Sequence, residues 1–182
     1  TAAEHYLDTA VDALTNRSVP YAALSKLPVP VDVTDAEGAV ISWNRACIEF
    51  AGRVPQLGED RWCVTWRIYT TAGEHLPHDQ CPMAQAIRER REIRGEVAIA
   101  MRPDGSRRAF TPYPTPLLDE GGGLKGAVNM LVDVSDAQAE VLAEQAERCR
   151  RLAQATPDRS INDLLTQMAE NYGETADALK SA

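Results

Sequence analysis

The sequence predicts an α+β fold in which antiparallel strands form the core and amphipathic helices lie at both ends of the chain. Three observations support this class. Residues 29–43 read as two strands around a turn at 36–38, which is typical of a β-hairpin. Residues 96–134 contain three further strand segments separated by turns. The two ends of the chain instead carry apolar residues at helical spacing.

Composition restricts the class of protein before any motif is considered. The chain has 182 residues, of which 44% are hydrophobic and 25% are charged, so it is long enough for one domain with helical extensions. No apolar run approaches the ~20 residues that a membrane span requires, and the N-terminal segment lacks the pattern of a secretory signal. We therefore expect a cytoplasmic protein without membrane contact. The net charge of −8 opposes binding to nucleic acid.

The N-terminal part is expected to contain helices on both sides of the hairpin. A first amphipathic helix is predicted by the helical spacing of Tyr6, Leu7, Ala10, Val11 and Leu14. A short second helix at 21–27 ends before a proline, and the hairpin follows it. Residues 44–52 begin with an asparagine and end with a glycine, which are the marks of a short helix with a cap at each end.

The middle of the chain is less regular. Residues 54–71 show no clear period, although a short extended segment is predicted by the alternation of Trp62, Val64, Trp66 and Ile68. A helix is expected from about Asp79 to Arg91. Three strands then follow, with turns at 103–105 and 119–123.

Prolines mark the middle one of these three strands. Pro112, Pro114 and Pro116 have the same parity, and backbone donors alternate sides along a strand, so all three missing N–H groups face the same neighbour. We expect this strand to pair well on one side and poorly on the other. The last strand, 127–134, is apolar at both parities, so both of its faces must be covered.

The tail is predicted to be a helical hairpin. Apolar residues recur at helical spacing after Ser135, and the sequence ATPD at 155–158 interrupts them. Thr156 is the expected N-cap of a second helix, with Pro157 at its first position. The pair of helices suits either packing on the same chain or contact with a partner.

Residues 24–136 resemble the PAS family of sensory domains. The segment LPVPVDVTDAEGAVISWNRA is similar to the family's opening, RPDGSRR to its later hairpin turn, and GAVNMLVDVSD to its last strand and exit. GEHLPHDQCPMAQAI is similar to the segment that introduces the long helix in one PAS subgroup. The resemblance divides the chain into a flanking helix at 1–23, a PAS domain at 24–136 and a helical extension at 137–182.

The resemblance implies a five-stranded antiparallel sheet with helices on one face, around a small-molecule pocket. The expected pocket residues are Trp43, Cys47, Phe50, Trp66, Met83, Ile87, Ile99, Asn129 and Leu131. The expected exit of the signal comprises Asp133, Val134, Ser135 and Asp136. Because PAS domains usually dimerise through flanking helices and the outer sheet face, the expected homodimer interface contains Leu7, Val11, Leu14, Val128, Met130, Val132, Leu142 and Cys149. Asn129 would either read a ligand or be a core residue bonded to the backbone.

Two departures from known PAS subgroups restrict the function. The flavin-binding photoreceptors carry an N-C-R-F-L-Q box, whereas this chain offers only WNRACIEF before its long helix, so covalent flavin photochemistry is not expected. No histidine follows His78, so the tail lacks the phosphoacceptor of a sensor kinase, and we find no catalytic motif. We expect a signalling module without enzymatic activity of its own, whose tail contacts a signalling protein.

Residues 75–87, HLPHDQCPMAQAI, leave several interpretations open. In the preferred interpretation this segment is only the start of a helix, in which Asp79 is the cap and Pro82 lies in the first turn, and it binds no metal or cofactor. A haem- or thiol-based redox or gas sensor would use His78 or Cys81. The candidate zinc ligands would be His75, His78, Cys81 and Cys63. The four cysteines, which include Cys47 and Cys149, form no C-x-x-C pair and are expected to be free thiols. A ligand-free interaction adaptor is the remaining alternative.

Overall fold

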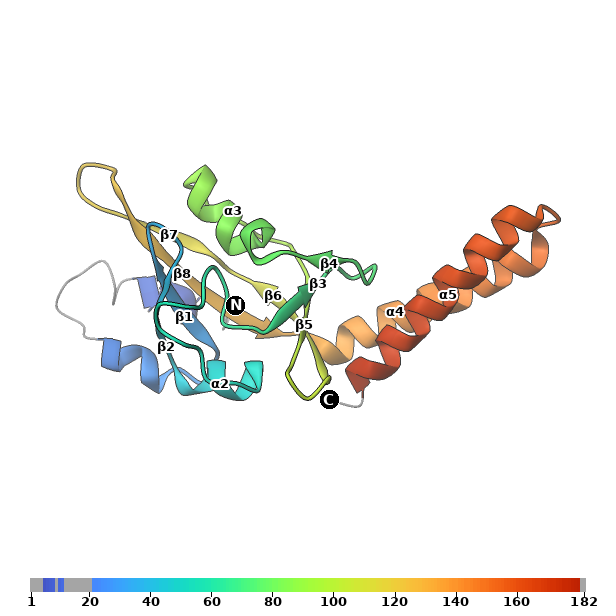
Figure 1. The fold of residues 1–182 in the computed structure, drawn as a ribbon, viewed down its shortest axis with the longest axis horizontal. Coiled ribbons are helices and arrows are strands. Elements are labelled where there is room, and N and C mark those ends of the chain that lie inside the picture. The colour runs from blue at the N-terminus through green and yellow to red at the C-terminus, as the bar shows by residue number, and fades with distance from the viewer. Residues whose placement is uncertain (1–4, 9, 12–20, 181–182) are drawn as a thin grey trace.

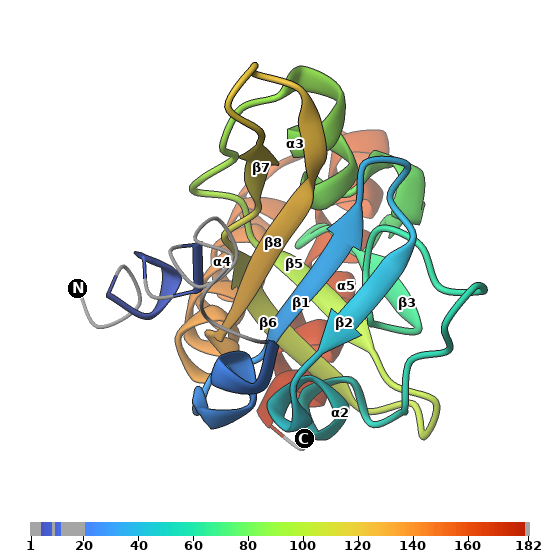
Figure 2. The same ribbon diagram turned by 90° about the vertical axis from the view of Figure 1, so that its left-hand side faces the viewer.

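The computed structural model describes residues 5–8, 10–11 and 21–180. Its centre is one antiparallel sheet in the order β2-β1-β8-β6-β5-β3-β4, with β7 paired to β8 (Figure 1, Figure 2). The strands are β1 (Val31–Asp35), β2 (Val40–Trp43), β3 (Arg67–Tyr69), β4 (His75–Leu76), β5 (Ala98–Met101), β6 (Arg107–Pro112), β7 (Thr115–Leu118) and β8 (Leu124–Asp133). The helical segments are η1 (Tyr21–Lys26), α2 (Arg45–Ala51), η2 (His78–Gln80), α3 (Pro82–Glu89), α4 (Ser135–Ala155) and α5 (Arg159–Lys180). The α+β class is confirmed, but the sheet has eight strands rather than five.

The extra strands arise in the middle of the chain. A short hairpin, β3–β4, extends the sheet beyond β5. Of the four alternating residues only Ile68 lies in a strand, and Trp62 has a left-handed backbone with a φ of 68°. The predicted extended segment from Trp62 to Ile68 is therefore wrong, because a left-handed residue breaks the alternation.

The proline-containing strand is divided into β6 and β7. Within the described residues β6 pairs with both β5 and β8, whereas β7 pairs with β8 alone. The predicted one-sided pairing is confirmed for β7, where it follows from the missing proline donors, but not for β6, which contains Pro112 and pairs on both sides. Pro114 lies between β6 and β7. Its carbonyl accepts hydrogen bonds from the guanidinium of Arg94 at 2.9 Å and from the backbone N–H of Ile93 at 3.4 Å.

Asn44 joins the first hairpin to α2. Its Oδ1 accepts the backbone N–H groups of Cys47 and Val31, each at 3.1 Å, and its Nδ2 donates to the carbonyl of Val29 at 2.7 Å. The helix ends at Gly52, whose left-handed φ of 65° suits a residue without a Cβ. Both predicted caps of this helix are confirmed.

The long helix begins later than the sequence analysis placed it. α3 starts at Pro82, and Asp79 lies in the separate 3₁₀ turn η2. Cys81 is the N-cap residue and makes no side-chain hydrogen bond to the helix, so the predicted capping role of Asp79 is wrong. The placement of Pro82 in the first turn is confirmed; its missing donor is not needed there.

Apolar side chains form three clusters on the two faces of the sheet. The interior cluster lies between the sheet and α2 and α3 and comprises Val40, Cys47, Phe50, Cys63, Val64, Ile68, Cys81, Met83, Ala84, Ile87, Ala98, Ala100, Phe110, Ala127 and Leu131. On the opposite face, the N-terminal cluster comprises Leu7, Ala10, Leu24, Val31, Val33, Leu117, Val128 and Met130. The tail cluster, also on that face, comprises Ile99, Ala109, Ala139, Leu142, Ala176 and Leu179. Both faces of β8 are covered, as its two apolar parities predict.

α4 and α5 form the predicted helical hairpin, which projects from one end of the sheet (Figure 1). The carboxylate of Asp158 accepts the backbone N–H groups of Ser160 at 2.9 Å and Ile161 at 3.1 Å, so Asp158 caps α5. The predicted cap, Thr156, instead donates its hydroxyl to the carbonyl of Leu152 at 2.7 Å and ends α4. None of the described helices is long and apolar enough to cross a membrane.

Candidate functional site

Three polar side chains interrupt the apolar interior face of the sheet. Asp32, Thr34 and Asn129 are only 0%, 1% and 2% exposed. Asp32 lies directly opposite Asn129 in the β1–β8 register. Because side chains alternate along β1, Val31 and Val33 join the N-terminal cluster while Asp32 and Thr34 face the interior cluster.

The oxygens of Asp32 and Thr34 are buried without hydrogen-bond partners. Among the described residues, neither carboxyl oxygen of Asp32 nor the hydroxyl of Thr34 has a partner. Burial raises the pKa of Asp32 from 3.8 to about 8, so its carboxyl is mostly protonated at neutral pH. Since nearly all buried polar groups are hydrogen-bonded, three unpartnered oxygens at adjacent inward positions identify a candidate binding site. Sequence reasoning missed both residues, because polar residues that alternate in a hairpin normally face solvent.

Three buried thiols share the interior with Asp32. Cys47, Cys63 and Cys81 are at most 3% exposed, and burial is the main cause that raises the pKa of each, with Asp32 adding to it. The pKa of Cys81 rises to about 11, although the backbone N–H groups at the start of α3 lower it. Burial therefore disfavours the thiolate of Cys81, because desolvation outweighs the effect of the helix start.

Most of the predicted pocket residues lie in the interior cluster. They are Cys47, Phe50, Met83, Ile87 and Leu131, and the half-buried Trp43 packs against the edge of the cluster. Phe50 contacts Phe110 edge to face, with ring centroids 5.5 Å apart. These side chains give the interior an apolar and partly aromatic wall.

Two predicted pocket residues lie elsewhere. Trp66 is 39% exposed, and the guanidinium of Arg67 lies 4.3 Å from the centre of its ring. Ile99 belongs to the tail cluster, because its neighbours Ala98 and Ala100 occupy the inward positions of β5. The predicted pocket role of both residues is therefore corrected.

Asn129 is held by the backbone. Its Oδ1 accepts the N–H of Tyr113 at 3.0 Å, where β6 gives way to β7. Tyr113 also donates this N–H to the carbonyl of Met130 at 2.9 Å. These contacts support the interpretation of Asn129 as a core residue whose amide oxygen is bonded to the backbone.

The suggested zinc ligands do not come together. His75 is exposed, and none of the described His, Cys, Asp and Glu side chains form a group of three or more that could hold a metal ion. His78 nevertheless has a buried Nε2 without a hydrogen-bond partner, and burial is the main cause that lowers its pKa. A neutral imidazole of this kind can accept a hydrogen bond or coordinate an iron.

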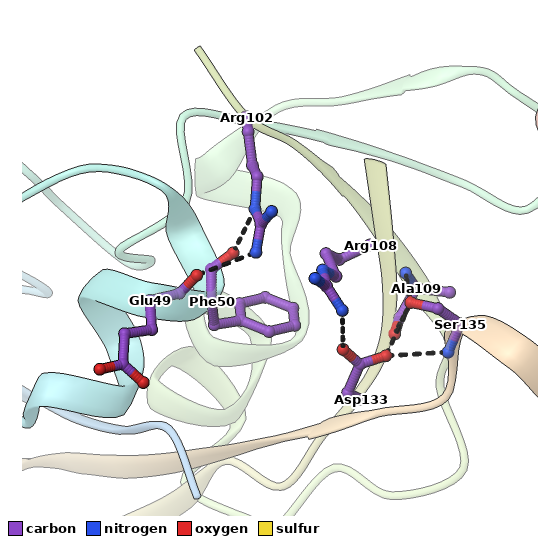
Figure 3. A network of polar contacts seen from close by, with 7 residues as sticks. All are labelled: Glu49, Phe50, Arg102, Arg108, Ala109, Asp133 and Ser135. Carbon is purple, nitrogen blue, oxygen red and sulfur yellow. Dashed lines mark hydrogen bonds and ion pairs between the residues drawn. The ribbon is translucent and has the colours of Figure 1, made fainter. Parts of the chain in front are cut away.

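The end of β8 is fastened to β6 directly before α4 (Figure 3). Asp133 pairs with Arg108 at 3.1 Å, and its Oδ1 accepts the backbone N–H of Ser135 at 2.9 Å and its hydroxyl at 2.6 Å. The Oγ of Ser135 accepts the N–H of Ala109 at 3.0 Å, and the N–H of Val134 donates to the carbonyl of Ala109 at 2.9 Å. The last residue of β8 and the first of α4 are thereby tied to neighbouring residues of β6.

The fourth residue expected at the exit, Asp136, is exposed on the first turn of α4 and lies outside this network.

A second arginine, Arg102, forms hydrogen bonds near the same end of the sheet. Arg102 donates to the carbonyls of Phe50 at 2.8 Å and Glu49 at 2.9 Å, and so links the turn after β5 to the end of α2 (Figure 3).

Seven of the eight residues expected at a dimer interface pack against their own chain. Leu7, Val128 and Met130 are buried in the N-terminal cluster and Leu142 in the tail cluster. Val11 and Val132 pack against the N-terminal cluster, Cys149 is buried on α4, and Leu14 lies outside the described residues. Within the one chain described, η1, residues 5–8 and 10–11 and the tail pack on the outer sheet face, and a dimer interface at these positions stays a prediction.

A sequence comparison identifies the family of the domain. The sequence profile of a family described as the PAS fold matches residues 24–139. No curated protein matches the chain.

Several solved structures are similar. The LOV protein of Rhodobacter sphaeroides has 13% identity and a TM-score of 0.48, over 89% of this chain and 94% of that one. The LOV domain of a blue-light-activated histidine kinase from Erythrobacter litoralis has 21% identity and a TM-score of 0.44, over 60% of this chain and 98% of that one. A PAS domain from Colwellia psychrerythraea has 19% identity and a TM-score of 0.44, over 68% and 98%.

Proposed function

The chain belongs to the PAS family, and on that premise we propose that it is a sensory module that couples a small molecule in its interior to its helical hairpin. The observation that supports this proposal is that β8 runs from the interior cluster to the start of α4. Leu131 of β8 faces the interior cluster, and two residues later Asp133 is fastened at the start of α4. A ligand changes the hairpin only as far as its affinities for two arrangements differ, so interior contacts near Leu131 are the proposed lever.

The hairpin offers the surface for a partner. Its exposed large apolar side chains are Val141, Leu152, Ile161 and Leu164, which are 47–56% exposed. Three of them lie near the turn between α4 and α5, the part that projects away from the sheet (Figure 1). Large apolar side chains that remain exposed are candidates for contact with a partner. We place here the contact with a signalling protein, or with a second copy in a homodimer, and expect a cytoplasmic module without its own enzymatic activity.

The coupling is tested by the distance between sheet and hairpin. Spin labels at Glu120→Cys and Gln154→Cys report this distance by pulsed electron resonance, because the four native cysteines are buried and should stay unlabelled. Leu131→Val, which disturbs the interior, should shift or broaden the distance distribution. Val132→Ala, which changes the opposite face of the same strand, is the matched control and should leave it unchanged. Equal distributions in both variants and wild type would count against the coupling.

Native mass spectrometry of the protein purified from its own cells tests the ligand. A bound small molecule supports the sensor, and the same spectrum reports the number of subunits. Protein that carries no small molecule but captures a partner through the hairpin would instead support the ligand-free adaptor.

A haem-carrying sensor is a second candidate, favoured by the unpartnered Nε2 of His78. Addition of haemin should then produce a Soret band that His78→Ala abolishes and His75→Ala retains, since His75 is exposed. A band that survives His78→Ala, or no band at all, would remove this candidate.

A further inference from the structure

We propose that the interior site binds a small organic cation whose ammonium or amidinium head is held by Asp32 and Thr34 and whose apolar body lies against the interior cluster. This inference rests on the proposed function, because it names the ligand class of the same site. It starts from three buried oxygens that the chain itself leaves without hydrogen bonds.

Once Asp32 is ionised, all three unpartnered oxygens can act as acceptors. Both carboxyl oxygens of Asp32 and the hydroxyl of Thr34 point to the same side of β1, two residues apart. A carboxylate accepts two parallel N–H groups from an amidinium, or the N–H groups of an ammonium, in charge-assisted hydrogen bonds. A ligand rich in donors therefore satisfies all three oxygens, whereas a purely apolar ligand satisfies none.

No cationic side chain faces Asp32 among the described residues that surround it. Asn129 of β8 and Trp43 of β2 are its cross-strand neighbours, and the groups that interact with it from α2, the loop before β3 and the start of α3 are the thiols of Cys47, Cys63 and Cys81. Burial alone accounts for the raised pKa of Asp32, with no positive charge opposing it. A buried carboxylate is costly without a counter-ion, and here a ligand cation is the group that would supply it.

The rest of the interior suits an apolar body. Phe50 and Phe110 meet edge to face, and Met83 is fully buried in the same cluster. A surface pocket of about 280 Å³ opens between α3 and β5, where it is lined by Ala98 of the interior cluster and by Leu76, which packs against the edge of the cluster. This pocket borders the β5 side of the cluster, and its lining does not include Asp32 or Thr34.

Binding of a cation should release one proton. The protonated carboxyl of Asp32 loses its O–H proton to solvent, and the carboxylate that forms pairs with the ligand cation. The affinity should therefore rise about tenfold per pH unit below pH 8 and level off above it. The neighbouring thiols stay neutral over this range, because burial raises the pKa of Cys81 to about 11 and those of Cys47 and Cys63 likewise upward.

The test is calorimetric titration of the full chain with benzamidine, 2-phenylethylammonium and the uncharged benzamide at pH 6, 7 and 8. At least one cation should bind wild type about tenfold more tightly at pH 7 than at pH 6, whereas benzamide should show no such dependence. Asp32→Asn keeps the shape but removes the charge, so it should abolish the pH dependence and weaken cation binding at pH 8 at least tenfold. Asp163→Asn removes an equal charge from the exposed face of α5 and should bind as wild type does. Thr34→Val, which is isosteric, should weaken the cation several-fold.

The proposal is overturned if neither cation binds wild type, or if both bind Asp32→Asn as tightly as wild type at pH 8. Circular dichroism of each variant establishes that it is folded before its titration is compared. The experiment distinguishes this inference from the proposed function. A cation that binds through Asp32 without changing the distance between sheet and hairpin would contradict only the proposed coupling. A different ligand that changes this distance independently of Asp32 would contradict only the proposed cation binding.

Discussion

Replacing Asp32 by asparagine should remove most of the dependence of folding stability on pH between pH 5 and 8. The carboxyl of Asp32 titrates near 3.8 in the unfolded chain and at about 8 in the folded one. Folding therefore raises the pKa of this carboxyl. Below pH 3.8 the group does not reduce the unfolding free energy, whereas the unfolding free energy falls as the pH rises from 3.8 towards 8. Asparagine has almost the same shape but carries no titrating proton.

The size of the effect follows from the shift. Each pH unit between the two pKa values costs the folded state about 1.4 kcal/mol, because the unfolded carboxylate releases its proton and the folded one does not. Between pH 5 and 8 wild type should lose about 4 kcal/mol relative to Asp32→Asn. That is a large fraction of the roughly 5–15 kcal/mol by which natural domains are stable.

Urea unfolding of both proteins, followed by tryptophan fluorescence at pH 5, 6, 7 and 8, measures this difference. Contributions from other groups are common to both chains and cancel, including the lowered pKa of His78, which acts in the opposite direction. A difference in unfolding free energy that stays constant across this range would refute the reasoning, since it would mean that Asp32 ionises in the folded protein as it does in water.

Three further outcomes are expected. Asn44→Ala should lower the unfolding free energy by about 2–4 kcal/mol in urea titrations, because one amide caps α2 and also bonds the backbone at the start of β1. Gly126→Ala should destabilise the protein, shown by a lower melting temperature, because its Cβ would collide with the carbonyl of Thr34. In the folded protein a thiol reagent at pH 7.5 should modify the buried Cys47, Cys63 and Cys81 at least tenfold more slowly than in urea, and equal rates would contradict their burial.

Features that act within a few residues could be predicted from the sequence. The caps of α2 and the one-sided pairing around Pro114 follow from an amide, a missing Cβ and missing donors, each with a local effect. The pattern did not reveal which face of a strand is interior, because that depends on segments distant in the chain. Ile99 faces the tail cluster because α4 and α5 fold back onto β5, and Asp32 faces inward because η1 covers the other side of β1.

The interior and the hairpin are separated by a single layer of sheet, and β6 contributes side chains to the clusters on both of its faces. Phe110 of β6 contacts Phe50 in the interior, while its neighbour Ala109 lies in the tail cluster. The N–H and carbonyl of Ala109 are also the groups that Ser135 and Val134 bind at the start of α4. Because successive side chains of a strand point to opposite faces, a displacement of Phe110 also moves the backbone that holds α4. An interior ligand would therefore reach the hairpin through β6 as well as along β8, and the two routes meet at Ser135.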